Sequence, residues 1–286
     1  MEFQLVLKEF WRALRKAPPT AWFGLLAILF YAFVAIFGPF LTPYGESEVV
    51  GTEFEEWAWF GEGFVLGTDN LGRDMLTRLV YGARNTIGIA FLTTVLTFML
   101  GSITGFIAST LGGWIDQLMS RIVDILMAVP SLIFALLILT ITGTSIPALI
   151  IVIAVLDSTR VFRLARAVSM NVVVMDYVEV ARLRGEGIWW IMNREVLPNA
   201  TAPLVAEFGL RFCFVFLFIS ALSFLGLGIQ PPLADWGSMV RDNATLITFG
   251  IATPLLPAAA VAVLTVAVNF VVDWFLHLTS GLREGH

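Results

Sequence analysis

Six stretches of apolar residues, each about as long as a bilayer is thick, limit the fold of this sequence more than any other feature. They lie near residues 22–41, 86–111, 119–141, 146–164, 203–228 and 251–276. A helix needs about 20 apolar residues to cross a hydrocarbon core roughly 30 Å thick. Lipid cannot hydrogen-bond open backbone groups, and no barrel-like alternation is present, so every span must be a helix. The sequence therefore predicts an all-α membrane protein with six transmembrane helices.

The composition supports this class. Hydrophobic residues make up 58% of the 286 residues and charged residues 14%, whereas soluble domains have roughly 45–50% and 25%. The net charge of −5 argues against a nucleic-acid partner, which would need a basic face. A single cysteine, Cys213, excludes an intramolecular disulfide and a cysteine metal cluster.

Prolines interrupt two of the apolar runs. Pro130 lies inside the third run, and Pro254 and Pro257 lie near the start of the last one. Proline is tolerated in membrane helices, where it often marks a kink. We therefore expect breaks at these positions.

The distribution of basic residues predicts the orientation in the membrane. Four of them, Lys8, Arg12, Arg15 and Lys16, precede the first run. The segment 43–84 has three basic residues against eight acidic ones, whereas arginines crowd the segment from 160 to 194. By the positive-inside rule, the N-terminus and the loop 165–200 are cytoplasmic and the segment 43–84 is external. Six spans then return the C-terminus to the cytoplasm.

The first twenty residues have the pattern of an amphipathic helix. Apolar residues recur at three- and four-residue spacing, at Phe3, Leu7, Phe10, Trp11 and Leu14. This pattern favours a cytoplasmic helix lying in the membrane interface over residues 1–20, before a six-helix transmembrane domain over 21–286. A disordered tail is the alternative.

The loop 165–200 is too long for a simple connection. Residues 177–184 are acceptable helix formers, and Gly185 and Gly187 break the pattern. A second short helix is expected over 188–196, ended by Leu197-Pro198. Two short helices with exposed aromatic residues fit a docking element, although a loop whose tryptophans anchor to lipid headgroups fits the residues equally well.

One motif in this loop has a known counterpart. Glu179-Val180-Ala181, followed by Gly185 and then by Leu197-Pro198, resembles the EAA loop of bacterial ABC importers, with Val180 in place of the usual alanine. The resemblance implies a coupling helix that docks on a separate ATP-binding subunit. The residues that would carry this coupling are Glu179, Ala181, Gly185, Gly187, Leu197 and Pro198.

Further motifs extend the resemblance over almost the whole chain. They are residues 66–74, 81–84, 112–116, 221–228, 230–232 and 235–237. Together they resemble the C-type permease subunit of the dipeptide, oligopeptide and nickel branch. The resemblance implies a type I ABC importer-like permease in the bacterial inner membrane, forming half of a heterodimeric pore. Its expected partners are a B-type permease subunit, two cytoplasmic ATP-binding subunits, an external solute-binding protein and membrane lipid, with peptides as the default substrate and nickel or other solutes as alternatives.

The sequence itself offers no catalytic site. A P-loop needs a lysine after a glycine-rich turn, and the two lysines, Lys8 and Lys16, have no such context. The histidines His277 and His286 lack the spacing of a zinc site. Asp69 and Asp74 lack the spacing of a calcium loop and fit helix capping and ion pairing instead. We expect no cofactor in this chain, no enzymatic activity, and ATP bound by the partner subunits.

Charged residues inside the apolar runs have two interpretations. Glu207 and Arg211 are four residues apart and share one helical face, as Asp157 and Arg160 share another. The first pair either lines a translocation path or is a structural ion pair, and the second fits a structural role. A self-sufficient secondary transporter would require more such groups near the middle of the membrane and a repeat between the halves, which the sequence lacks.

Overall fold

The computed structural model describes residues 17–55 and 63–279, and the secondary structure of these residues is helical. In chain order the elements are α2 (Pro19–Leu41), α3 (Met75–Leu111), α4 (Gly113–Ala128), α5 (Ser131–Thr142), α6 (Ile146–Val173), α7 (Asp176–Leu183), α8 (Ile188–Ile191), η1 (Met192–Val196), α9 (Leu197–Phe224), α10 (Trp236–Asp242), η2 (Ala244–Phe249) and α11 (Leu255–Thr279). Within the described residues the extended pairing is limited to isolated bridges. The all-α class is confirmed, while the interfacial helix expected over 1–20 falls mostly on residues outside the described part.

Four helices are long and apolar enough to cross a membrane. They are Pro19–Leu41, Met75–Leu111, the continuous helix Ile188–Phe224, and Leu255–Leu278. The bent pair α4 and α5 makes a fifth candidate. Helix α6 has 28 residues, but Asp157, Arg160 and Arg163 lie in its middle and lower its hydropathy.

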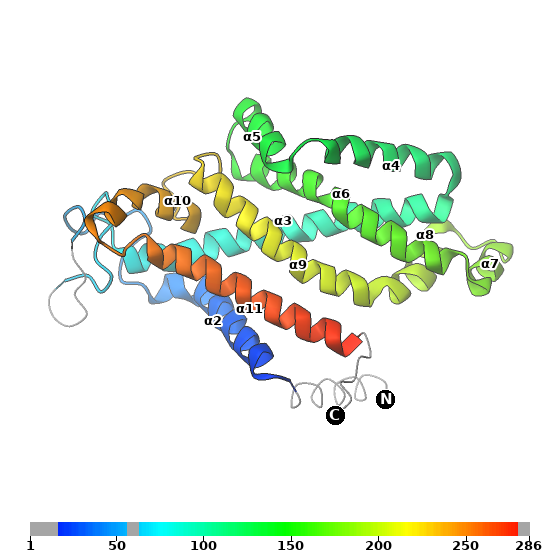
Figure 1. Ribbon diagram of the computed structural model, residues 1–286, viewed down its shortest axis with the longest axis horizontal. Coiled ribbons are helices and arrows are strands. Elements are labelled where there is room, and N and C mark those ends of the chain that lie inside the picture. Colours follow the sequence, from blue (N-terminus) through cyan, green and yellow to red (C-terminus); the bar gives the residue numbers. More distant parts are fainter. Residues whose placement is uncertain (1–16, 56–62, 280–286) are drawn as a thin grey trace.

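The long helices alternate in direction along the chain. In Figure 1, α2, α9 and the α4–α5 pair run one way, and α3, α6 and α11 run the other way. The segment before α3 and helix α10 lie at one end of the molecule, and α7 lies at the opposite end (Figure 1). This arrangement separates an acidic polar end from the end that carries α7.

The third apolar run is broken at the expected proline. Helix α4 ends at Ala128, α5 begins at Ser131, and the two are bent by 86°. Val129 is extended, with φ −92° and ψ 132°, as the residue before a proline prefers to be. The break expected at Pro130 is confirmed, and its angle separates the run into two helices.

Two glycines allow α3 and α6 to lie in close contact. A Cβ atom at Gly101 would lie 2.7 Å from the carbonyl oxygen of Ser158, and one at Gly105 would lie 2.8 Å from that of Phe162. Small residues four apart let two membrane helices approach in this way. The contact fixes α6, and with it the start of α7, against α3.

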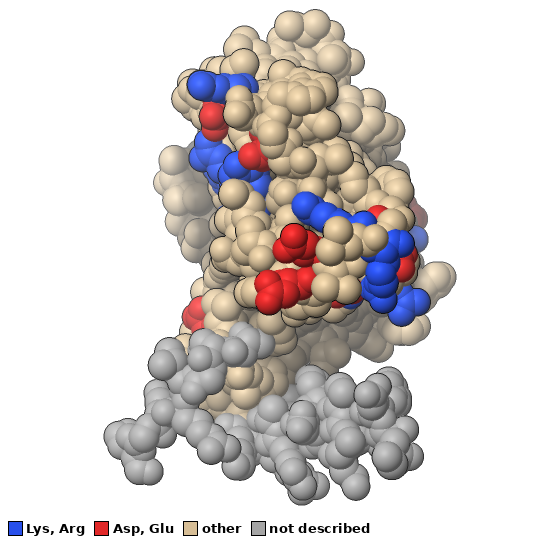
Figure 2. All heavy atoms as spheres, turned by 90° about the vertical axis from the view of Figure 1, so that its right-hand side faces the viewer, with Lys and Arg blue, Asp and Glu red and all other residues tan. Residues whose placement is uncertain are grey.

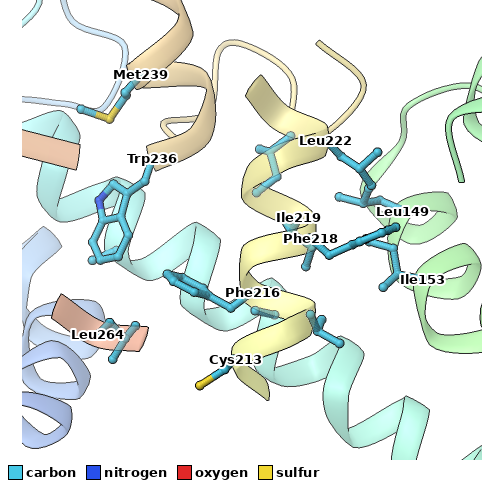
Figure 3. Close-up of a cluster of buried hydrophobic side chains, with 14 of the residues drawn as sticks. Leu149, Ile153, Cys213, Phe216, Phe218, Ile219, Leu222, Trp236, Met239 and Leu264 are labelled. Carbon is cyan, nitrogen blue, oxygen red and sulfur yellow. The ribbon is translucent and has the colours of Figure 1, made fainter. Parts of the chain in front are cut away.

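The buried centre of the bundle is built around Trp236 (Figure 3). Its side chain is 1% exposed, and its indole Nε1 donates to the carbonyl oxygen of Leu79 at 2.9 Å. Its ring packs edge-on against the ring of Phe216 in α9, with 6.1 Å between the ring centres, and against that of Tyr31 in α2, with 5.7 Å between the centres. The side chain of Trp236 thereby ties α10 to α2, α3 and α9.

The polar segment before α3 is ordered by carboxylates. Asp69 pairs with Arg73 at 2.7 Å and with Arg78 at 3.2 Å, and Asp74 caps α3 by accepting from the backbone N of Thr77. The expected capping and ion pairing are confirmed. However, the cap starts α3 at Met75 rather than near residue 86, because these pairs keep the charged first turns helical.

Candidate functional site

Helix α7 and the short α8 form a hairpin at one end of the molecule. In Figure 1 they extend past the end of α9, and Figure 2 looks directly onto this end. Basic and acidic side chains gather there around uncharged surface (Figure 2). The hairpin is the part of the described structure that projects furthest from the bundle at this end.

Gly185 makes the turn between the two helices. Its φ is +82°, in the left-handed region, and its N–H donates to the carbonyl oxygen of Arg182 at 2.9 Å. The next residue, Glu186, donates from its N–H to Ala181 at 3.2 Å. This pair of bonds is the Schellman motif that ends many helices, and glycine adopts its φ without strain. The break expected at Gly185 is confirmed.

One face of α7 is buried against the bundle. Val178 and Ala181 are fully buried in a cluster with Ile191, Met192 and Val196 of the following segment. The same cluster includes Phe106 of α3, Ala165 and Val172 of α6, and Ala200 and Leu204 of α9. This cluster therefore joins the hairpin to three long helices.

The opposite face of α7 is apolar and exposed. Leu183 is 82% exposed, Val180 is 51% exposed, and Trp189 of α8 is 60% exposed. Glu179 is exposed beside them. We call this set (Tyr177, Val180, Leu183 and Trp189) the apolar tip. Exposed apolar groups in such a patch mark a contact surface.

Polar contacts hold the apolar tip in place. Arg182 Nη2 donates to the carbonyl oxygen of Thr110 at the end of α3, at 3.0 Å. Asn199 Nδ2 donates to the hydroxyl of Tyr177 at 3.3 Å. Arg184 lies over the ring of Trp190, 5.6 Å from its centre. The hairpin is thus tied to α3 and α9 as well as to α6.

Leu197 and Pro198 lie where the sequence predicts the end of a helix, and here that prediction is wrong. Residues 188–224 form one continuous helix, because the π-helical turn Met192–Val196 joins α8 to α9. Pro198 is the second residue of α9 and lies just after the π-turn, so the change of helical register occurs next to the residue that lacks an N–H donor. A π-turn inside a helix is rare and is often found at functional positions. Gly187 precedes this helix in an ordinary extended conformation, with φ −73°.

A second candidate is a charged network within the bundle. Arg211 Nε lies 2.7 Å from Glu207 Oε1, so the predicted pair is confirmed. Arg211 Nη1 also lies 3.4 Å from Asp157 Oδ1 of α6, and Arg160 Nη1 lies 3.6 Å from the same oxygen. Both guanidinium groups lie over the ring of Phe214, at 4.3 Å for Arg160 and 5.4 Å for Arg211. The network ties α9 to α6.

This network borders a cavity of about 310 Å³ next to the α4–α5 break. Asp157 and Arg160 line it together with Phe214 and Phe218. The side chain of Asp157 is 4% exposed, whereas that of Glu207 is 21% exposed. The contact between Asp157 and Arg211 was not predicted, since no spacing in the sequence shows that α6 packs on α9 at this level.

Among the described residues, no group of three or more His, Cys, Asp or Glu side chains is placed to hold a metal ion. The candidate sites therefore consist of an exposed apolar surface and a compensated charge network.

Comparisons with known proteins agree with a transport role. Residues 97–280 match the family model described as the binding-protein-dependent transport system inner membrane component. Residues 6–53 match the N-terminal TM domain of oligopeptide transport permease C. The two matches leave out residues 54–96, which are the end of the segment before α3 and the first part of α3 itself.

Curated relatives span nearly the same length. The di/tripeptide transport system permease protein DppC of Pseudomonas aeruginosa is 36% identical, covering 97% of this chain and 90% of its own. The dipeptide permease DppC of Alkalihalophilus pseudofirmus is 33% identical over 91% of this chain and 83% of its own. The peptide permease SapC of Escherichia coli O6:H1 is 34% identical over 93% and 91%. All three are named as transport permeases, so the role that they share is not enzymatic.

A solved structure shows the same fold. The crystal structure of an amino acid ABC transporter with histidines aligns with a TM-score of 0.51 at 19% identity, covering 69% of this chain and 92% of that one. Family match, relatives and apolar helices lead to one conclusion: the chain belongs to the inner membrane components of binding-protein-dependent transport systems, as a multi-pass permease subunit of the bacterial inner membrane.

Proposed function

We propose that this chain is the C-type permease subunit of an ATP-driven peptide importer and forms half of a heterodimeric pore with a B-type permease subunit. Two cytoplasmic ATP-binding subunits supply the energy, and an external solute-binding protein delivers the substrate. The peptide transport named for the relatives supports the substrate class. ATP is bound by the partner subunits and not by this chain.

The proposal includes six spans with both termini in the cytoplasm. The spans are α2, α3, the α4–α5 pair, α6, α9 and α11, and their alternating direction in Figure 1 supports this count. α6 is included because the charges in its middle are paired within the bundle: Asp157 is shared by Arg160 and Arg211. The arginines near α7 favour a cytoplasmic location for that end, and the acidic segment 43–55 favours an external location for the other.

The exposed apolar tip at the end of a rigidly tied hairpin is the observation that carries the functional proposal. An apolar surface tied to three helices suits docking of a partner that must move the bundle. In this proposal Glu179 contacts the ATP-binding subunit beside the apolar tip. Ala181 and Gly185 hold α7 in shape, Gly187 starts the return segment, and Leu197 and Pro198 continue it into α9.

The continuity of residues 188–224 suggests how movement is transmitted. A displacement of α8 passes through the π-turn directly into α9, because no loop separates them. The buried contacts of Val178 and Ala181 pass the same displacement to α3 and α6. ATP binding in the partner subunits would thereby reorient the helices around the pore.

We extend the proposal to Glu207 and Arg211 as residues that line the translocation path. Their side chains are 21% and 17% exposed, so water or substrate can reach them more readily than Asp157. The contact with Asp157 favours a structural role for the same residues. Loss of uptake by variants that still assemble would favour the path, and loss of assembly would favour the structural role.

A docking experiment tests the proposed function. Leu183→Asp places a charge in the middle of the apolar tip, and Val49→Asp is the matched control on an exposed valine at the opposite end, 64% exposed. We expect Leu183→Asp to lose the ATP-binding subunits on co-purification and Val49→Asp to retain them. Full retention and full uptake with Leu183→Asp would contradict the proposal.

A further inference from the structure

Helix α2 makes two close approaches to the rest of the bundle, one near each of its ends. A Cβ atom at Gly24 would lie 2.5 Å from the carbonyl oxygen of Ala267 in α11. At the other end, a Cβ atom at Gly38 would lie 2.4 Å from the side chain of Val80 in α3. Both glycines are buried, whereas most of the helix between them is not.

Between these two contacts lies a large apolar crevice of about 740 Å³. Helices α2, α3, α9 and α11 form its walls, with Ile28, Ala32, Gly88, Phe91, Phe212 and Leu264 among its lining residues. Gly88 leaves room in it, since a Cβ atom there would meet no atom within 4 Å. The space therefore arises from the packing of four helices, and the glycine at position 88 keeps it open.

Arg84 is the charged residue among those that line the crevice, and it is exposed. Within the described residues it forms no ion pair or hydrogen bond. It lies at the polar end of the membrane segment, because the next residue, Asn85, donates to Glu46 and to the carbonyl oxygen of Ala234. A rise of 1.5 Å per residue places Arg84 about 13 Å from the start of α3.

The length of α3 puts this position at the edge of the hydrocarbon core. A 37-residue helix is about 55 Å long, so about 25 Å extend beyond a core roughly 30 Å thick. If the excess is shared between the two sides, the core begins close to Arg84. At this depth, the unpaired guanidinium of Arg84 lies within reach of the phosphate groups of the lipid headgroups.

We propose that the crevice binds one acyl chain of an anionic phospholipid, with the lipid phosphate on Arg84. Guanidinium groups bind phosphate through two parallel hydrogen bonds. The apolar walls of the crevice would contact the acyl chain in place of neighbouring lipid tails. An apolar helix of a partner subunit would cover the walls of the crevice but would offer the guanidinium of Arg84 no anionic group.

Lipid retention by the full chain tests this proposal. The purified protein is exchanged into detergent with phosphatidylglycerol or phosphatidylcholine, and bound lipid is measured by native mass spectrometry. Arg84→Gln removes the charge, and Gly88→Trp fills the crevice from a position with open space. The matched controls are Arg121→Gln, an exposed arginine of α4, and Leu29→Trp, on a residue of α2 that is 64% exposed.

We expect the unmodified chain to retain phosphatidylglycerol over phosphatidylcholine. Arg84→Gln should lower phosphatidylglycerol retention about fivefold, which is the effect of one basic residue at a membrane surface. Gly88→Trp should abolish retention of both lipids, and neither control should change it. Undiminished lipid retention by the Gly88→Trp variant would overturn the proposal. A second test uses Gly88→Cys: cross-linking of this cysteine to a partner permease subunit, and not to a photoreactive lipid, would also overturn it.

Discussion

Arg211 of α9 lies 3.4 Å from Asp157 of α6, and this contact joins two helices through residues that are more than fifty positions apart in the chain. Asp157 is almost fully buried, and its second carboxylate oxygen has no hydrogen-bond partner in the described residues. The ion pairs with Arg211 and Arg160 therefore compensate most of its charge. A buried charge left without its partner is strongly destabilising.

Removing Arg211 should cost more than removing both charges. Arg211→Gln leaves Asp157 with Arg160 alone, so we expect a loss of roughly 3 kcal/mol, the lower end for a broken buried pair. The double change Asp157→Asn with Arg211→Gln should be less destabilising than Arg211→Gln. Thermal unfolding of the purified variants measures this difference.

Glu207→Gln is the matched comparison for that series, since Glu207 is more exposed than Asp157. It should lose less stability than Arg211→Gln. Equal stability of all variants would mean that the network contributes nothing to folding.

Asp235 should make stability depend on pH. Its carboxylate accepts from the N–H of Ser238 at 2.8 Å and from the hydroxyl of Thr86 at 2.9 Å. Burial raises the pKa of Asp235 above its ordinary value, and the hydrogen bonds only partly oppose this. Its stabilising contribution is then fully present below the unfolded pKa and is lost as pH rises through the folded pKa.

Asp235→Asn retains an acceptor for the cap of α10 and removes the titration. Its unfolding temperature should therefore show a weaker dependence on pH as the pH rises above about 4, the ordinary pKa of an aspartate. Asp235→Ala should lose about 1–3 kcal/mol at every pH, because Ser238 and Thr86 lose their acceptor. A pH profile of Asp235→Asn identical to that of the unmodified chain would contradict this account.

Glu46 should hold the segment 43–55 onto the bundle. Its Oε1 accepts from Asn85 at 2.7 Å and from the N–H of Ala234. Glu46→Ala removes the acceptor of the Ala234 N–H and leaves Asn85 Nδ2 with the carbonyl oxygen of Ala234 alone, so we expect faster hydrogen exchange across 43–55 and a loss of about 1–3 kcal/mol. Glu48→Ala is the control, since Glu48 accepts from Gly45 within the same segment. Equal exchange in the two variants would exclude this role for Glu46.

Local relationships were the part of this structure that the sequence predicted well. The pairing of Glu207 with Arg211 follows from helix geometry alone, and the turn at Gly185 follows from the glycine itself. Asp157 and Arg211 could not be paired in advance, because their contact depends on how α6 packs on α9. The close approach that α3 makes to α6 depends on long-range packing in the same way.

Helix ends were predicted less well. The pattern at Leu197-Pro198 predicts the end of a helix, yet a π-turn directly before it joins α8 to α9 in one continuous helix. Proline removes its own N–H donor and its ring crowds the carbonyl four residues earlier, and the π-turn just before Pro198 changes the helical register at this point. The start of α3 was placed too late because the ion pairs of Asp69, which stabilise charged turns, leave no mark in a hydropathy pattern.

The proposed orientation has a direct chemical test. In a Cys213→Ala background, a cysteine at Ser47 should react with an impermeant thiol reagent added to intact cells. A cysteine at Asn193 should react only after the membrane is opened. Both positions are exposed, so the reagent can reach a cysteine at either one. Cys213 is buried, and its replacement leaves the introduced cysteine as the one that is labelled. The reverse labelling pattern would overturn the orientation and the docking proposal with it.

ATP-driven peptide uptake by the reconstituted Gly185→Val complex tests the central claim most directly. A Cβ atom at Gly185 would meet nothing within 4 Å, so the substitution acts through its φ of +82° and not through a clash. Gly143→Val is the matched control, with φ +87° and equally open space at the end of α5. β-Branched residues adopt such a φ only with strain.

We predict that both variants insert and assemble, that Gly185→Val loses uptake or hydrolyses ATP without transport, and that Gly143→Val transports normally. Full uptake by an assembled Gly185→Val complex would contradict the claim that this hairpin couples the ATP-binding subunits to the pore.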